Sequence, residues 1–223
     1  TERGLSNPEI YERFKIGYSD GLLPKQDELI QSLKDIGILT EDGYELFYKC
    51  VIFPIEDMDG NTLSIYGRHT EEKTHRYNKG PHRGVFNARA FKASRTIYIT
   101  EAVIDALSLY QVGIREVVSL FGTGGLTDDH IKYMRDTLTK EVVLSLDNDD
   151  AGQAAARRIA LRLNDELGII CKTLVLPDGV KDINEWLAKG MTKGDVLKSV
   201  RELAPSIAST GEAHGDPAVS PSA

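Results

Sequence analysis

The chain has 223 residues, of which 41% are hydrophobic and 27% are charged, a balance typical of globular proteins. Its formal net charge of −7 argues against broad, non-specific binding of nucleic acid over the whole surface. No apolar run approaches the roughly 18 residues that span a membrane, and no signal-peptide pattern follows Thr1. The two cysteines are far apart and match no zinc-binding spacing, which favours buried free thiols in a cytoplasmic protein.

Residues 1–94 are predicted to form a smaller α+β subdomain. Asn7-Pro8 is a helix-start signal, and a second helix is expected over residues 26–34. Two alternating apolar stretches, 50–55 and 62–66, flank Asp59-Gly60-Asn61, a pattern typical of a β-hairpin. Because the chain begins with Thr rather than Met, we expect it to be a fragment of a longer protein.

Residues 66–95, which we call the basic segment, carry eight positive side chains against Glu71 and Glu72. Gly80-Pro81 within it predicts a loop. Tyr66, Tyr77 and Phe86 interleave with the charges, so phosphate contacts combined with base stacking are one interpretation. A solvated loop is the alternative, and His69, His75 and His82 are interpreted as surface polar residues. The basic side chains are Arg68, Lys73, Arg76, Lys79, Arg83, Arg89, Lys92 and Arg95.

Residues 95–190 alternate between predicted strands and helices, which indicates an α/β fold with a mainly parallel central sheet flanked by helices. A helix is expected within 191–204, about Lys193–Leu203, and a flexible linker or tail over 205–223. The expected strands are 96–100, 116–121, 141–146 and 169–176, and the expected helices are 102–110, one from near Thr127, 151–167 and 183–188.

Acidic residues follow three of these strands. Glu101 comes directly after the first, Asp147 and Asp149 after the third, and Asp182 after the fourth. Asp105 lies four residues beyond Glu101, which places both on one helix face if the helix starts there. Ligands of open parallel sheets bind at the carboxyl ends of the strands. Clustered carboxylates repel one another, and Mg²⁺ or Mn²⁺ relieves that repulsion, so this edge is suited to phosphoryl or nucleotidyl transfer.

A structural explanation exists for each of these acids taken alone. Asp and Glu after strands often cap the next helix, as Asp147 or Asp149 could cap the helix over 151–167. The loop Gly122–Gly125 also lies at a strand end, where glycine lets the backbone approach a phosphate closely. It is weak evidence alone, because it matches neither a P-loop nor a dinucleotide-binding fingerprint.

Several motifs together resemble a TOPRIM domain, the fold of primases, topoisomerases and some nucleases. They are the strand 96–100, Glu101–Asp105, Ser119–Thr123 and Asp147–Gly152. The segments before and after them resemble bacterial DnaG-type primases. Among these, they are more similar to the primases of phages and mobile elements. These segments are Leu5–Tyr18, Val51–Asp57, Gly67-Arg68, His75–Gly80, Pro81–Asn87, Leu176–Gly179 and Lys181-Asp182.

The resemblance implies a primase catalytic core that synthesises short RNA primers on single-stranded DNA from NTPs. Glu101, Asp147 and Asp149 would be catalytic and would bind Mg²⁺ or Mn²⁺, with Asp105 and Asp182 as further metal ligands. Asn184 stands where many relatives have an aspartate. Nucleic acid or nucleotide would be bound by Arg68, Arg76, Lys79, Arg83, Gly122 and Thr123.

The implied partners are a single-stranded DNA template, NTPs, and a replicative helicase or a domain outside this chain, with no membrane partner. The zinc module that usually precedes such a core is absent from the sequence. Two alternatives stay open: a metal-dependent nuclease that uses the same acids, and a non-catalytic nucleic-acid-binding module in which the acids only cap helices.

Overall fold

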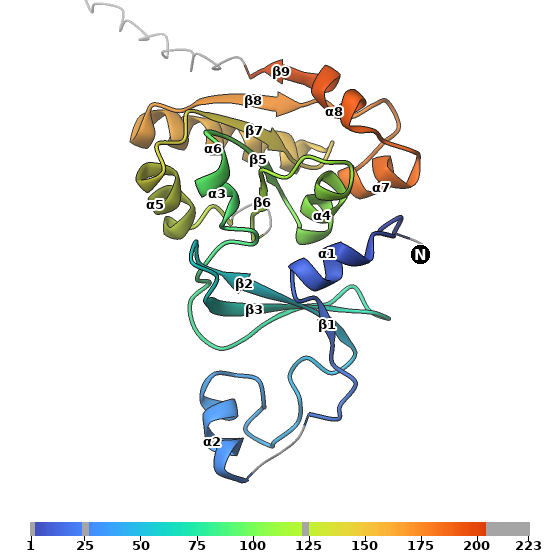
Figure 1. Cartoon of the computed structure of the whole chain (residues 1–223), viewed down its shortest axis with the longest axis vertical. Coiled ribbons are helices and arrows are strands. Elements are labelled where there is room, and N and C mark those ends of the chain that lie inside the picture. The colour runs from blue at the N-terminus through green and yellow to red at the C-terminus, as the bar shows by residue number, and fades with distance from the viewer. Residues whose placement is uncertain (1–2, 24–26, 122–124, 204–223) are drawn as a thin grey trace, which may run out of the picture.

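Two β-sheets form the framework of the molecule (Figure 1). The computed structural model describes residues 3–23, 27–121 and 125–203. The first sheet has the strand order β1-β2-β3-β4, and all of its neighbouring strands are antiparallel. The second has the order β6-β5-β7-β8-β9, and only the β8–β9 pair is antiparallel. The α/β fold with a mainly parallel sheet is therefore confirmed. The predicted tail, 205–223, lies outside the described residues.

The first sheet contains the predicted hairpin, now β2 and β3. The Asn7 side chain accepts a hydrogen bond from the Glu9 N–H at 3.0 Å and so caps the first helix. The prediction of a loop for the whole basic segment was wrong, because β3 extends to His69 and pairs with β4. The elements are α1 (Pro8–Arg13), β1 (Gly17–Tyr18), α2 (Asp27–Asp35), β2 (Cys50–Glu56), β3 (Thr62–His69), β4 (His75–Tyr77) and α3 (Ala90–Ala93).

The second sheet follows the predicted alternation until its last strand. Residues 200–202, predicted as helix, instead form β9 on the edge of β8. The β8 edge offers backbone partners there, and the β-branched Val200 fits opposite Leu174 in the extended chain. The elements are β5 (Thr96–Thr100), α4 (Val103–Gln111), β6 (Val117–Ser119), α5 (Asp128–Asp136), β7 (Glu141–Ser145), α6 (Asp150–Leu167), β8 (Ile170–Leu174), α7 (Ile183–Ala188), α8 (Lys193–Ser199) and β9 (Val200–Glu202).

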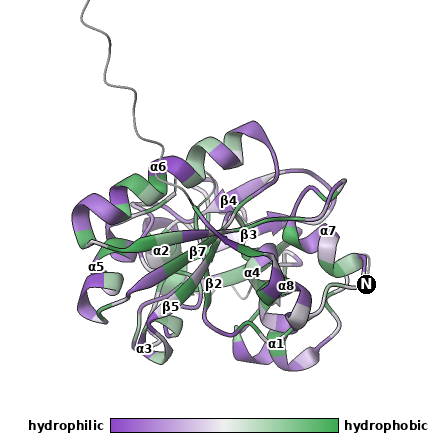
Figure 2. Ribbon diagram, turned by 90° about the horizontal axis from the view of Figure 1, so that it is seen from above, coloured by the Kyte–Doolittle hydropathy of each residue, from purple (hydrophilic) through white to green (hydrophobic). Residues whose placement is uncertain are grey.

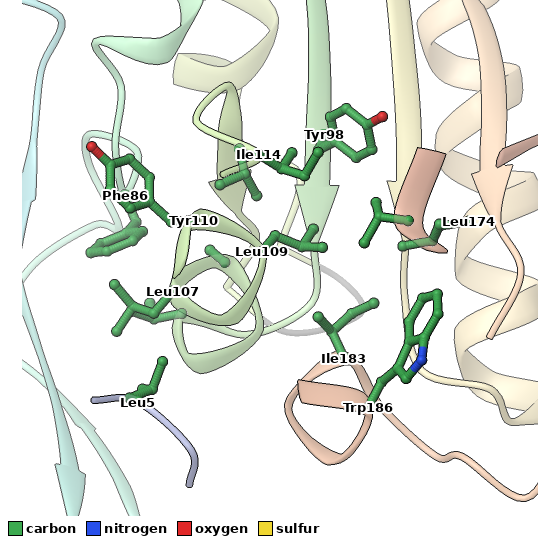
Figure 3. Close-up of a cluster of buried hydrophobic side chains, with 14 of the residues drawn as sticks. Leu5, Phe86, Tyr98, Leu107, Leu109, Tyr110, Ile114, Leu174, Ile183 and Trp186 are labelled. Atoms are coloured by element: carbon green, nitrogen blue, oxygen red, sulfur yellow. The ribbon is translucent and has the colours of Figure 1, made fainter. Parts of the chain in front are cut away.

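Two hydrophobic cores cover the faces of the parallel sheet. One contains α5 and α6 residues, and α6 buries Ala155, Ala156, Ile159 and Leu163 against the sheet. Hydrophilic and hydrophobic residues alternate along α6 in Figure 2. The other joins the two sheets. It packs Phe53 and Tyr66 of the first sheet together with Leu107 and Tyr110 of α4 and Trp186 of α7. Figure 3 shows the last three of these side chains. Residues from both sides of the predicted boundary near residue 94 therefore pack in one shared core.

Short bridges also connect the sheets along the chain. Val85 pairs with Glu56 of β2, and the adjacent Phe86 pairs with Ser119 of β6. Cys50 and Cys171 are both free and buried. Among the helices described, none combines the length and the apolar content that a membrane span needs.

Candidate active site

A cleft of about 460 Å³ separates the carboxyl ends of β5 and β7 from one face of the first sheet. Acidic side chains line one side and mostly aromatic or basic side chains line the other. The acidic side contains Glu101, Asp105, Asp147 and Asp182, and the opposite side contains Tyr66, Arg68, His75, Tyr77 and Phe86. The other polar residues of the lining are Arg3, Ser119, Lys181 and Asn184.

The parallel pairing of β5 and β7 brings Glu101 and Asp147 to the same edge. Thr100 lies opposite Ser145 in this pair, so the residues that follow leave the sheet side by side. The turn after β7 is tight, because a Cβ atom at Gly152 would lie 2.2 Å from the Asp147 carbonyl oxygen. Glycine at this position is therefore required for the backbone that carries Asp147.

Mutual repulsion and burial characterise these two carboxylates. Burial raises the pKa of Glu101 above its ordinary value, and the charges of Asp147 and Asp149 raise it further. Burial also raises the pKa of Asp147, with Asp182 as its strongest like-charge neighbour and Lys181 opposing the shift. Among the described residues, Oε2 of Glu101 is buried without a hydrogen-bond partner. These carboxylates are therefore costly to keep ionised without a positive partner.

Asp105 is the most deeply buried of the acids. Burial raises its pKa to about 7, and the nearby Asp182 charge contributes to the shift. Its Oδ1 accepts a hydrogen bond from the Asn184 N–H at 3.0 Å. The Asn184 side chain donates to Ser108 Oγ at 3.0 Å and to the Arg3 carbonyl at 2.8 Å, and it accepts from the Arg3 guanidinium at 3.2 Å. Asn184 therefore connects α7, α4 and the N-terminal segment.

Asp149 and Asp182 are helix caps. Oδ1 of Asp149 accepts from the Gly152 N–H at 2.8 Å and begins α6, while Oδ1 of Asp182 accepts from the Glu185 N–H at 2.7 Å and begins α7. Asp149 is exposed and does not line the cleft, although its charge acts on Glu101. Asp182 combines a cap with a place in the cleft wall.

Of the four basic residues predicted to bind nucleic acid, only Arg68 lines the cleft. Strand register explains the difference. Arg68 on β3 lies opposite His75 on β4, whereas Arg76 lies opposite Gly67 and so belongs to the other face of the sheet. Arg76 donates to the Leu46 carbonyl there.

The other two basic residues also lie away from the acidic edge. Lys79 forms an ion pair with Glu41 at 3.8 Å. The Arg83 N–H donates to Ser64 Oγ at 3.1 Å, and this exposed residue is not part of the cleft lining. Arg68 is therefore the only one of the four predicted basic contacts that the structure places in the cleft; Arg76, Lys79 and Arg83 lie outside it.

The aromatic residues of the basic segment serve mostly as core. Tyr66 and Phe86 are buried, so the interpretation that they stack on bases was wrong. Their rings pack with Phe53 and Phe14, respectively. Tyr77 is half-buried in the cleft wall.

Two of the three histidines of this segment, His69 and His75, form hydrogen bonds within the protein. His69 is buried, where its Nδ1 accepts the N–H groups of Glu71 and Glu72, so its interpretation as a surface residue was also wrong. His75 is exposed but hydrogen-bonded through Nδ1 to the Tyr66 hydroxyl at 2.6 Å.

Sequence reasoning missed Arg3 and His75 as parts of the cleft, and it noted Lys181 only through the resemblance. For His75 a signal was present, because alternation along a β3–β4 hairpin places it beside Arg68. No local pattern indicated Arg3, which reaches the cleft through long-range packing of the N-terminal segment.

Of the predicted glycine loop 122–125, the structure describes only Gly125, and Gly122, Thr123 and Gly124 lie outside the described residues. His130 fixes the helix that follows the loop. Burial lowers the pKa of His130 to about 4, so its ring is neutral near pH 7. Its Nδ1 accepts from the Thr127 N–H and hydroxyl, which assigns the proton to Nε2, 3.1 Å from the Ser119 carbonyl.

Comparison with known proteins assigns both halves of the chain. Residues 1–99 match the N-terminal domain of the DNA primase catalytic core, and residues 98–187 match a Toprim-like domain. Over residues 1–187 the chain therefore resembles the catalytic core of DnaG-type primases. A DNA primase of Clostridium acetobutylicum is 32% identical over an alignment of 213 positions, which covers 84% of this chain and 34% of that protein.

Solved structures of the primase core agree. The Escherichia coli primase catalytic core aligns with a TM-score of 0.71 and 27% identity, over 88% of this chain and 69% of that one. A DnaG primase catalytic domain bound to single-stranded DNA aligns with a TM-score of 0.69 and 26% identity, over 90% of this chain and 72% of that one. Compared with full-length primases rather than with solved cores, the chain spans about a third of the length of the curated primases it matches.

The acidic edge of this chain fits a divalent cation in its donor chemistry. Hard carboxylate oxygens suit Mg²⁺ and Mn²⁺, and the unpartnered Oε2 of Glu101 would gain a partner. Within the described ranges, no three acidic, His or Cys side chains converge into a ready-made metal site. Mg²⁺ commonly uses one or two carboxylates together with substrate phosphates, so two carboxylates such as Glu101 and Asp147 would be compatible with such a site.

Proposed function

We propose that this chain is the catalytic core of a primase, which synthesises short RNA primers on single-stranded DNA by metal-dependent nucleotidyl transfer from NTPs. The observation that carries the proposal is the cleft in which Glu101 and Asp147 face Arg68. The resemblance to DnaG-type primase cores supports it, as does the DnaG domain bound to single-stranded DNA among the structural neighbours.

Each side of the cleft has a distinct role in this proposal. Glu101 and Asp147 hold the Mg²⁺ or Mn²⁺ ion, with Asp149, Asp182 and Asp105 as further candidates. When bound, the cation offsets carboxylate charge and binds phosphate oxygens. Arg68 would bind a phosphate of the template or the nucleotide in a geometry that favours guanidinium groups. Lys181, which already opposes the pKa rise of Glu101 and Asp147, would counter developing negative charge.

The test is template-directed primer synthesis with labelled NTPs, single-stranded DNA and Mg²⁺ or Mn²⁺. Glu101→Gln and Asp147→Asn keep the side-chain shape but remove the charge, and each is expected to lower primer synthesis at least roughly 100-fold. Asp165→Asn, an exposed carboxylate on α6, is the matched control and should keep full activity. Full activity of either cleft variant would overturn the site assignment.

Two alternative functions, a nuclease and a non-catalytic binding module, can be tested with the same purified protein. A nuclease would degrade labelled single-stranded DNA without NTPs and would lose that activity in the Glu101→Gln variant. The caps formed by Asp149 and Asp182 favour the other alternative, a binding module in which the acids only begin helices. Calorimetric titration with Mn²⁺ in the presence of nucleotide tests it, since an absence of binding heat would support the module. A helicase or further domain as partner stays an expectation of the resemblance.

A further inference from the structure

Residues 17–23 and 27–48, which we call the α2 lobe, begin at β1 on the edge of the first sheet, and the remainder projects away from the parallel sheet (Figure 1). None of these described residues belongs to either hydrophobic core. Along α2 itself, which the structure describes completely, no residue is buried, although the helix is amphipathic. Leu39 and Phe47 are the buried apolar residues of the described lobe. The lobe therefore has an apolar face that packs against little of its own chain.

That apolar face is extensive. Leu22 is 78% exposed and Tyr44 is 71% exposed, and each large apolar side chain left in water forgoes roughly 1.5–3 kcal/mol of burial energy. The other exposed members are Tyr18, Leu23, Leu29, Ile36 and Tyr48. Three of these exposed residues, Tyr18, Leu22 and Leu23, line a groove of about 380 Å³, whose other apolar lining residues are Ile38, Phe47, Ile52 and Ile65. Exposed apolar side chains gathered at a groove indicate an interaction site.

The lobe that forms most of this groove is rich in acidic residues. Residues 17–48 contain seven acidic residues, against Lys25 and Lys34 as the only basic ones in the sequence of this stretch. Asp20 and Glu45 line the groove itself. Glu45 accepts from Ser19 Oγ at 2.6 Å and from the Leu23 N–H at 2.7 Å, which fixes the groove wall.

This charge decides between classes of partner. Nucleic acid is disfavoured, because its phosphates would be repelled by the lobe. Pairing of two α2 lobes is disfavoured for the same reason, since it would bring like charges together. A partner with positive charge flanking apolar side chains is complementary both to the acidic residues of the lobe and to the apolar lining of the groove.

We propose that the α2 lobe binds a basic amphipathic helix of another protein. Apolar side chains spaced by one helical turn would enter the groove, and flanking Lys or Arg residues would face the carboxylates. A helix fits better than an added strand, because the edge strand β1 offers only Gly17 and Tyr18 for backbone pairing. This inference is independent of the proposed primase activity, since the lobe contributes no residue to the acidic cleft.

The test is a selection from a displayed library of random peptides about four helical turns long, with the whole chain as target. We expect enriched peptides to carry Lys or Arg and apolar residues at i, i+3 or i+4, and i+7. Binding of the enriched peptides is then measured by fluorescence anisotropy. Leu22→Ser and Asp20→Lys, both at exposed positions that line the groove, should each weaken it at least roughly tenfold, because loss of an anchor or reversal of a charge that faces the partner typically costs that much.

Matched controls are Leu197→Ser on α8 and Asp165→Lys on α6, which change exposed residues outside the lobe and should leave peptide binding unchanged. Thermal unfolding of each variant checks that it is folded. Three results would overturn the proposal: enriched peptides that are acidic or lack helical periodicity, equal binding to the Leu22→Ser variant, or a concentration-dependent dimer that Leu22→Ser abolishes. The last would identify a second copy of the chain as the occupant.

Discussion

At the scale of single residues, Asp105 has the most unusual ionisation. Burial and the neighbouring Asp182 raise its pKa from an ordinary 3.8 to about 7. Because the folded state holds this proton more tightly than the unfolded state, the carboxyl group costs nothing below about pH 4. Stability is lost as the pH rises towards 7, by a few kcal/mol in all, at about 1.4 kcal/mol per pKa unit.

Asp105→Asn removes this ionisation and keeps an acceptor for the Asn184 N–H. In metal-free buffer with EDTA, we expect the variant to gain unfolding free energy over the native chain progressively from pH 4 to pH 8. Urea unfolding at several pH values measures the gain. Asp165→Asn, at an exposed position, should show no such trend. A pH-independent difference for Asp105→Asn would contradict the assignment of a raised pKa to this group.

Arg68 and Arg76 form a second comparison at this scale, because β-strand alternation places them on opposite faces of the first sheet. Arg68→Ala should lower kcat/KM for primer synthesis by roughly 10- to 100-fold, which matches about 1.5–3 kcal/mol for a charged hydrogen bond. Arg76→Ala should lower stability through loss of its bond to the Leu46 carbonyl but change kcat/KM less than about twofold. Equal kinetic losses for the two variants would show that the basic segment acts through its total charge.

At the scale of elements, the turn from β7 into α6 positions Asp147. A Cβ at Gly152 would lie 2.2 Å from the Asp147 carbonyl oxygen, so the backbone must shift. Gly152→Ala is therefore expected to reduce primer synthesis at least about tenfold, since displacement of a catalytic group by about 1 Å is costly. Gly194→Ala is the matched control in α8, where the nearest atom would be 3.7 Å away. It should keep activity and add up to about 1 kcal/mol of stability.

The sequence allowed most elements to be predicted because their signals are local. Apolar strands alternating with helices gave β5 to β8 and the placement of Glu101 and Asp147 after strands. Residues 200–202 were mispredicted because helical periodicity there was outweighed by pairing with β8, which is a long-range effect. The part of the site that could not be predicted also depends on long-range packing. Arg3 reaches the cleft only because the N-terminal segment packs on α4 and α7, through Leu5 and the bonds of Asn184.

At the scale of the whole molecule, the two sheets depend on one core. Phe14 of the N-terminal half contacts Tyr110 of α4 with ring centroids 4.9 Å apart, and Leu5 is buried in the same cluster. Figure 3 shows Leu5 and Phe86 on the α4 side of the cluster that also contains Trp186. A cleft formed between two sheets needs such a shared core, because relative motion of the sheets would separate Arg68 from Glu101 and Asp147.

This arrangement predicts a single unfolding transition for both halves. Trp186, the only tryptophan, reports on the shared core, while far-UV circular dichroism reports on all helices and strands. The two signals should give the same urea midpoint, because coincident transitions are the mark of cooperative unfolding. Leu5→Ala, which removes a buried side chain at a cost of about 2–5 kcal/mol, should lower both midpoints together. The exposed Leu197→Ala is its control and should change neither. A circular dichroism transition that splits in two, with only one part following Trp186, would show instead that the halves unfold as separate domains.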